Sequence, residues 1–166
     1  VGQIPFGRGE LVRHKSIVRR GLNDKLYKEL TTDGSYKRNY TRSFGNSKFD
    51  TVIDYSGYGI PQPLTLMQCE GAKRVIWQHN DLLLDLTNSQ KKKRGVYRRS
   101  SATPIESLVT LYDYFDEVVS CSEAIMKTNR RNLSTEATYD KFTFSTNPID
   151  FDRIKDCCGK AVYEDG

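Results

Sequence analysis

The sequence predicts an α/β domain built on an open, mostly parallel sheet with helices on both of its faces. From residue 51 onward, short runs of β-branched and aromatic residues alternate with segments of helical periodicity. Turn or cap residues follow each run. The length of 166 residues suits one domain with a core of its own. Strands that alternate with helices are joined by crossovers, which makes the strands parallel.

The first part of the pattern lies between residues 51 and 79. The run 51–55, Thr-Val-Ile-Asp-Tyr, predicts a strand that ends in a glycine turn over 56–59. Two prolines suit the first turn of a helix over 61–71, and a glycine suits its end. The run 73–78 predicts the second strand, and it stops at His79, one of two histidines in the chain.

The second part begins with the strongest helix-start signal in the chain, 103–106, Thr-Pro-Ile-Glu. Its threonine can cap a helix, its proline fits the first helical position and its glutamate completes a capping box. Strands are predicted over 117–121 and 141–145, and Ser122 can cap a helix after the first of them. The helix that begins at residue 103 carries an apolar face at helical spacing: Ile105, Leu108, Val109, Tyr112 and Phe115.

The first 48 residues give a weaker signal. Leu22, Leu26 and Leu30 support one helix by their spacing. No glycine-rich phosphate-binding motif is found there. We expect residues 1–150 to form one domain and residues 151–166 to begin an interdomain hinge or a tail.

Basic residues are concentrated in one segment. The chain has 26 basic and 21 acidic residues, and six of the basic ones lie between residues 86 and 103, where no acidic residue occurs. This segment is interpreted either as a solvated surface loop or as a contact for a polyanion, which could be a phosphate-containing polymer, an anionic membrane surface or a nucleic acid. The six residues are Lys91, Lys92, Lys93, Arg94, Arg98 and Arg99.

The remaining composition excludes several classes of protein. The four cysteines have no CxxC spacing and are interpreted as reduced intracellular thiols, so neither a disulfide framework nor a metal site is expected. No apolar run approaches the roughly 18 residues of a membrane span. We therefore expect a cytoplasmic protein.

Small or polar residues follow every predicted strand. In a parallel sheet the carboxyl ends of the strands share one edge, where ligands collect, so we expect these residues to line one wall of a binding site. Each has a structural explanation when taken alone, because a serine before a helix is usually a cap and an asparagine before proline is usually part of a turn. The candidates are Ser56, Gly57, His79, Asn80, Asp81, Ser120, Cys121, Ser122 and Asn147.

Four blocks of this chain resemble successive blocks of bacterial glycosyltransferases. Their order and spacing together carry the resemblance, which covers residues 49–154. The chain is similar to the glycosyltransferase family 4 type, especially to enzymes of teichoic-acid-like or capsular polymer synthesis. The blocks are Phe49–Tyr58, Arg74–Asp81, Tyr114–Ser122 and Lys141–Asp150.

The resemblance implies the acceptor-side half of a GT-B enzyme, in which two Rossmann-like domains face a cleft. His79 matches the histidine that lines the reaction centre of the family, Ser122 the serine after the third strand and Asn147 the asparagine before the hinge. The implied reaction transfers sugar from a nucleotide-activated donor with retention and without a metal or other cofactor. The donor would be bound by a second domain whose motifs this chain lacks, so we expect the segment alone to be inactive.

Under this resemblance the basic segment gains a function, since it follows His79 and could contact an anionic acceptor or the inner face of the cell membrane. Two alternatives stay open. The chain could be a non-catalytic domain that binds polyanions or nucleic acid, although no RNA- or DNA-binding motif supports this. It could also be a regulatory domain that has only the fold of a transferase half.

Overall fold

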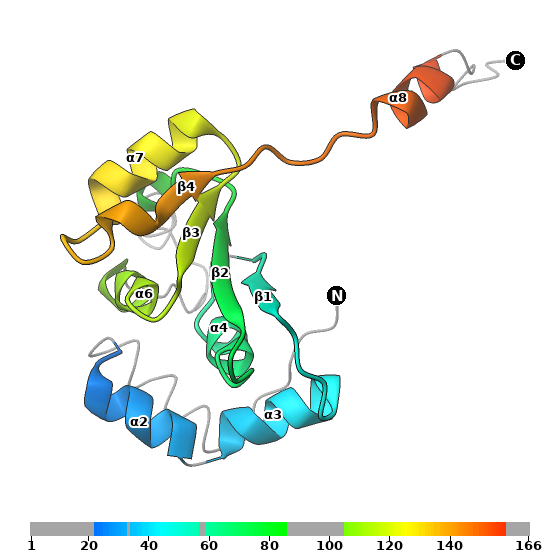
Figure 1. Ribbon diagram of the computed structural model, residues 1–166. Helices are drawn as coiled ribbons and strands as arrows, with labels where there is room; N and C mark the ends of the chain where they lie inside the picture. The colour runs from blue at the N-terminus through cyan, green and yellow to red at the C-terminus, as the bar shows by residue number, and fades with distance from the viewer. Residues whose placement is uncertain (1–21, 33, 57–58, 86–104, 159–166) are drawn as a thin grey trace, which may run out of the picture.

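The computed structural model describes residues 22–32, 34–56, 59–85 and 105–158 (Figure 1). Strands and helices alternate after residue 50, as the sequence predicts. In chain order the elements are α2 (Asp24–Thr32), α3 (Ser35–Phe44), β1 (Thr51–Asp54), α4 (Pro61–Leu66), β2 (Lys73–Gln78), α6 (Ile105–Tyr112), β3 (Glu117–Ser120), α7 (Glu123–Leu133), the 3-10 helix η2 (Tyr139–Lys141), β4 (Phe142–Phe144) and α8 (Phe151–Cys158).

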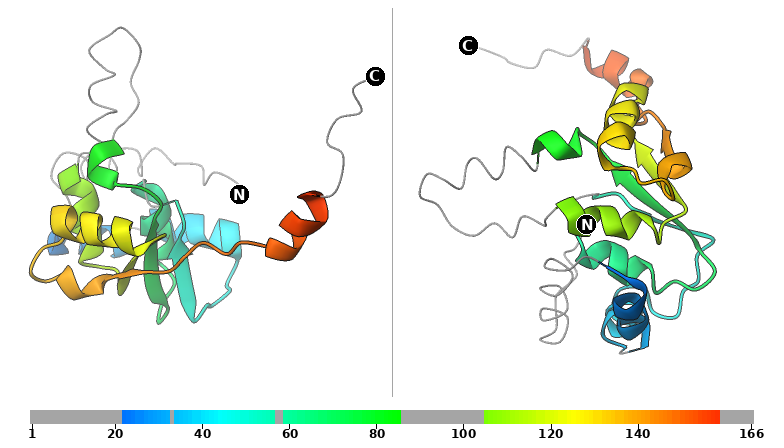
Figure 2. Two further views of the ribbon diagram at one scale, coloured as in Figure 1. Left: turned by 90° about the horizontal axis from the view of Figure 1, so that it is seen from above. Right: turned by 90° about the vertical axis from the view of Figure 1, so that its left-hand side faces the viewer.

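The four strands form one sheet in the order β1-β2-β3-β4, and every neighbouring pair is parallel. The predicted α/β fold with a Rossmann-like, parallel sheet is therefore confirmed. Each crossover moves to the next strand in the same direction, and crossovers between parallel strands are right-handed. For this reason α4, α6 and α7 all lie on one face of the sheet (Figure 2).

The opposite face of the sheet is covered by no helix within the described ranges. Along β1, exposed and buried side chains alternate, which is the pattern of a strand with one covered face. Ile53 is 47% exposed and Tyr55, the next residue on the same face, is 53% exposed. The sequence predicts helices on this second face as well, and they are not among the described elements.

The core lies between the covered face of the sheet and the helices. Ile76 of β2 and Val118 of β3 are fully buried in it. Leu108 and Tyr112, on the predicted apolar face of α6, are buried in the same core, and so is Phe115, which follows the end of the helix. The signal that predicted a helix start at 103–106 lies largely outside the described residues, because the description of α6 begins at Ile105.

Within the described residues, two helices precede the sheet. The predicted helix around Leu22 and Leu26 is α2, and both leucines are buried in the main core. The helix α3, which the sequence pattern does not predict, packs against α4, and its tyrosines Tyr36 and Tyr40 are buried. The charged residues of this segment conceal the helix in the sequence, because its apolar side is made of tyrosines rather than aliphatic residues.

An extended segment, residues 145–150, leads from β4 across the sheet to α8 (Figure 1). Every residue of α8 is exposed, and the helix stands apart from the sheet. The division at residue 150 stays a prediction, because nothing in the structure tests whether α8 belongs to a hinge. In the described parts of the chain, no helix has the length and apolar character needed to cross a membrane.

Candidate functional site

The candidate site lies at the carboxyl edge of the sheet. All four strands are parallel, so the residues that follow them emerge at this one edge, as the sequence analysis expected. The structure connects three of these segments through one residue, Tyr55, which uses both its backbone and its side chain. Its backbone oxygen is 2.7 Å from the His79 Nε2 atom, and its hydroxyl lies 3.4 Å from Asn147 Oδ1. His79 and Asn147, which are far apart in the sequence, are thus linked through β1.

His79 is held in one orientation by this contact. The Tyr55 backbone oxygen can only accept a hydrogen bond, so the Nε2 atom of His79 must donate it. In the neutral ring this leaves the lone pair on Nδ1, which has no hydrogen-bond partner among the described residues. The ring is half-buried and meets the Tyr55 ring edge-on at a centroid distance of 4.5 Å. Nδ1 is therefore an oriented group that can accept a proton or a hydrogen bond from a ligand.

A buried polar network supports the backbone beneath His79. The side chain of Gln78 donates a hydrogen bond to the Tyr112 hydroxyl (2.7 Å) and accepts one from the Ser120 hydroxyl (3.1 Å). Asn129 of α7 donates to the Gln78 side chain at 3.0 Å. All four side chains are 1% exposed or less. Such fully satisfied networks fix one arrangement of the groups they connect.

Asn129 also holds the loop that follows β2. Its amide nitrogen donates to the Asn80 backbone oxygen at 2.9 Å, and its side-chain oxygen accepts from the Leu82 backbone nitrogen at 3.1 Å. On the other side of His79, the Cys121 thiol donates to the His79 backbone oxygen at 3.1 Å. The position of the His79 backbone is thus determined by α7 and by the end of β3.

Asn80 and Asp81, both predicted as binding residues, are engaged in their own loop. The Asn80 side chain donates to the Asp85 carboxylate at 2.9 Å. The Asp81 carboxylate accepts from the Leu84 backbone nitrogen at 3.0 Å and so caps the helical turn formed by residues 82–85. The structure therefore gives both residues a structural function.

The predicted serines also have structural partners. The Ser122 hydroxyl accepts a hydrogen bond from the Ile125 backbone nitrogen at 3.3 Å, which makes Ser122 the N-cap of α7, as predicted. The Ser56 hydroxyl donates to the buried Asp54 carboxylate at 2.7 Å. Gly57, the other residue predicted in this turn, lies outside the described residues.

Four residues of this region were not singled out from the sequence: Tyr55, Trp77, Gln78 and Asn129. The period of two along a strand contains a signal for the first two, because Tyr55 lies on the same face as Ile53, and Trp77 on the same face as His79. Asn129 has no such signal. Its partners are about fifty residues away in the chain, and an asparagine within a helix is ordinarily a surface residue.

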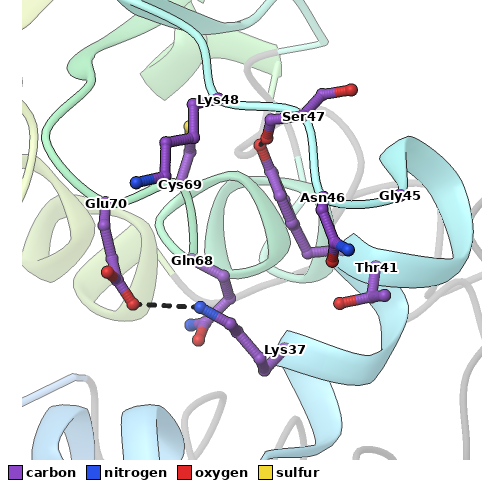
Figure 3. Close-up of a pocket in the computed structure, with 10 residues that line it drawn as sticks. Lys37, Thr41, Gly45, Asn46, Ser47, Lys48, Gln68, Cys69 and Glu70 are labelled. Atoms are coloured by element: carbon purple, nitrogen blue, oxygen red, sulfur yellow. Dashed lines mark hydrogen bonds and ion pairs between the residues drawn. The ribbon is translucent and has the colours of Figure 1, made fainter.

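A separate hollow of about 170 Å³ lies at the opposite, amino-terminal edge of the sheet (Figure 3). Lys37 of α3 and Glu70 form an ion pair of 3.0 Å across it, and Lys37 lowers the pKa of the Glu70 carboxyl. Burial raises the pKa of Tyr40 to about 12, and a hydrogen bond with Cys69 adds to this shift. The hollow shares no residue with the carboxyl edge. Its remaining lining residues are Thr41, Gly45, Asn46, Ser47, Lys48 and Gln68.

The described residues contain neither a possible metal site nor the predicted basic segment. Within the ranges that the structure covers, no three histidine, cysteine or acidic side chains come together as a possible metal site. The predicted polyanion contacts all lie outside the described residues: Lys91, Lys92, Lys93, Arg94, Arg98 and Arg99.

Comparison with known proteins adds no family to this description. No protein-family model matches the chain, and no curated protein matches it.

Proposed function

We propose that this chain is the acceptor-side domain of a bacterial GT-B glycosyltransferase, which moves a sugar from a nucleotide-activated donor to a cell-surface polysaccharide, teichoic-acid-like or lipid-linked acceptor. The observation that carries the proposal is the orientation of His79. Its Nε2 atom is held by Tyr55, and its Nδ1 atom is available at the carboxyl edge of a parallel sheet. Ligands of open α/β sheets bind at this edge.

The proposal gives each part of the edge a task. His79 hydrogen-bonds the reacting sugar or the acceptor hydroxyl through Nδ1, while the network around Gln78 and Asn129 keeps its backbone in place. The glycosyl bond to the donor phosphate breaks and the nucleotide phosphate leaves, a bond to the acceptor oxygen forms, and the proton of the acceptor hydroxyl passes to the released phosphate. The donor nucleotide is assigned to a second domain, and no metal is required.

The basic segment around Lys91–Arg94 follows His79 in the chain. In the proposed enzyme it contacts a phosphate-containing acceptor or the anionic lipids of the inner membrane face, which would put the enzyme in the cytoplasm as a peripheral membrane protein. This part of the proposal depends on the sequence alone.

The test uses the protein together with its second domain, which is sought in the adjoining coding sequence. His79→Ala and His79→Gln are compared with the parent in transfer from nucleotide sugars to polysaccharide, lipid-linked saccharide and polyol-phosphate acceptors. The glutamine amide keeps a donor toward the Tyr55 backbone oxygen but removes the acceptor at Nδ1, so it separates chemistry from positioning. Both variants should lose about 100-fold or more in kcat, as for other groups that contact the transition state.

Two results would reject the proposal. One is a His79→Gln variant with full transfer activity and unchanged thermal stability. The other is a longer protein that transfers no sugar and instead binds RNA or DNA with a steep dependence on salt, which would favour a nucleic-acid-binding domain.

A further inference from the structure

Three aromatic rings gather on the uncovered face of the sheet, at its carboxyl edge. We call Tyr55, Trp77 and His79 the aromatic ledge. The Tyr55 ring lies 5.5 Å from the Trp77 ring and 4.5 Å from the His79 ring, between centroids. Tyr55 follows β1, whereas Trp77 and His79 belong to β2 and its end, so the parallel pairing of two strands creates the cluster.

The ledge is ordered but open. The His79 ring is fixed by its bond to the Tyr55 backbone, and the Tyr55 hydroxyl reaches Asn147 on the segment that crosses from β4. Even so, 53% of Tyr55 is exposed, and Trp77 is only half-buried. A tyrosine that served the core alone would be covered. A held and exposed aromatic surface is typical of a ligand-binding site.

The chemistry around the ledge favours a neutral ligand with hydroxyl groups. The charged side chains of Lys73 and Glu117 lie toward the amino-terminal end of this face and pair with each other at 2.6 Å. The polar groups that border the rings are uncharged amide and imidazole groups, on Asn147 and His79. A polyanion would find no unpaired cation among the described residues of this face.

A pyranose ring has the complementary structure. Its C–H groups carry a partial positive charge and form an apolar face that fits the negative face of an aromatic ring, while its hydroxyls project around the rim. We infer that the aromatic ledge is a saccharide subsite, in which one pyranose ring stacks on Tyr55 and Trp77 and its hydroxyls meet Asn147 and the Nδ1 atom of His79. This inference rests on the proposed function for the identity of the sugar as the acceptor.

The chain provides a local reporter for the test. Trp77 is its single tryptophan, so tryptophan emission comes from the ledge alone. The full chain is titrated with cellotriose, maltotriose and triacetylchitotriose, with sorbitol as the control for a flexible polyol. At least one trisaccharide should change the emission of Trp77 in a saturable way, and sorbitol should not.

Three variants assign the response to the ledge. Tyr55→Ala should weaken binding about tenfold, which corresponds to the loss of one aromatic contact, and it keeps the backbone oxygen that holds His79. Tyr55→Phe keeps the ring and should bind within about threefold of the parent. Tyr139→Ala removes a tyrosine of similar exposure, 48%, from outside the ledge and should leave binding unchanged.

Three results would overturn the inference: no saturable response to any trisaccharide, equal binding by Tyr55→Ala and the parent, or an emission change that follows protein concentration without saccharide. The last would mean that a second copy covers this face. The two proposals fail separately. If trisaccharides bind at Tyr55 but the longer protein transfers no sugar, the ledge remains a saccharide site and the transferase proposal fails. If transfer occurs and Tyr55→Ala has no effect on binding, only the ledge fails.

Discussion

Replacing Asn129 by alanine tests whether the buried network holds the His79 loop. The side chain is fully buried, and it makes three hydrogen bonds, to the Gln78 side chain and to the backbone of Asn80 and Leu82. A typical hydrogen bond contributes about 1 kcal/mol to the free energy of unfolding, so their loss costs about 3 kcal/mol. The higher helix propensity of alanine offsets about 0.5 kcal/mol of this loss in the free energy of unfolding. The net loss should be about 2.5 kcal/mol.

Asn132→Ala is the matched control, since Asn132 lies on the same helix but is exposed. It makes the same change in helix propensity and should alter the free energy of unfolding by about 0.5 kcal/mol or less. Urea unfolding followed by circular dichroism measures both variants. Asn129→Ala should also melt about 5–10 °C below the parent. A difference of less than about 1 kcal/mol between the two variants would refute the reasoning, because at least one buried backbone group would then have found another partner.

The other predictions concern the helix cap, alkaline pH and the basic segment. Ser122→Ala removes the cap of α7 and should lower the free energy of unfolding by about 1 kcal/mol, whereas Ser122→Asp keeps a capping oxygen and should lower it much less. Equal losses for the two variants in urea unfolding would contradict a capping function of Ser122. The pKa values of Tyr40 and Tyr114 are raised from an ordinary value of 10.0 to about 12, and burial is the main cause. The unfolded chain therefore loses these protons first, and stability should fall as the pH rises from about 10 to about 12. Replacing both tyrosines by phenylalanine should flatten this loss, and an unchanged slope of stability against pH would contradict it. Changing Lys91, Lys92, Lys93 and Arg94 to glutamine should weaken binding to phosphatidylglycerol vesicles at low salt. The control variant changes four exposed basic residues elsewhere to glutamine and should weaken binding less: Lys25, Lys127, Arg131 and Lys155. Equal vesicle binding by the two variants would reject a specific contact.

The sequence could predict what depends on local pattern. The strands β1 and β2 begin at the predicted residues, because β-branched runs between turn residues have few alternatives. Ser122 was expected to cap a helix, and it does. The meeting of the strand ends also follows from local pattern, since it needs only that the strands are parallel.

What the sequence could not predict depends on tertiary packing. The helix α3 buries tyrosines instead of aliphatic side chains, so its apolar face is not apparent. Asn80 and Asp81 bond with backbone and side-chain groups of their own loop, contacts that a sequence pattern cannot distinguish from ligand binding, and their expected function in binding a ligand stays a prediction. The partners of Asn129 are set only when α7 packs against the end of β2.

The direction of the crossovers links these observations. Because the strands follow one another in sequence order across the sheet, α4, α6 and α7 lie together on one face, and their side of the strand ends is occupied by the network of Gln78, Ser120 and Asn129. The side chains that alternate with these residues, on Tyr55, Trp77 and His79, must then project from the other face. One face of the edge thus supplies rigidity and the other supplies the exposed groups. Substitutions at Asn129 should therefore lower stability and disturb His79 together, whereas substitutions at the Tyr55 ring should change ligand binding with little change in stability.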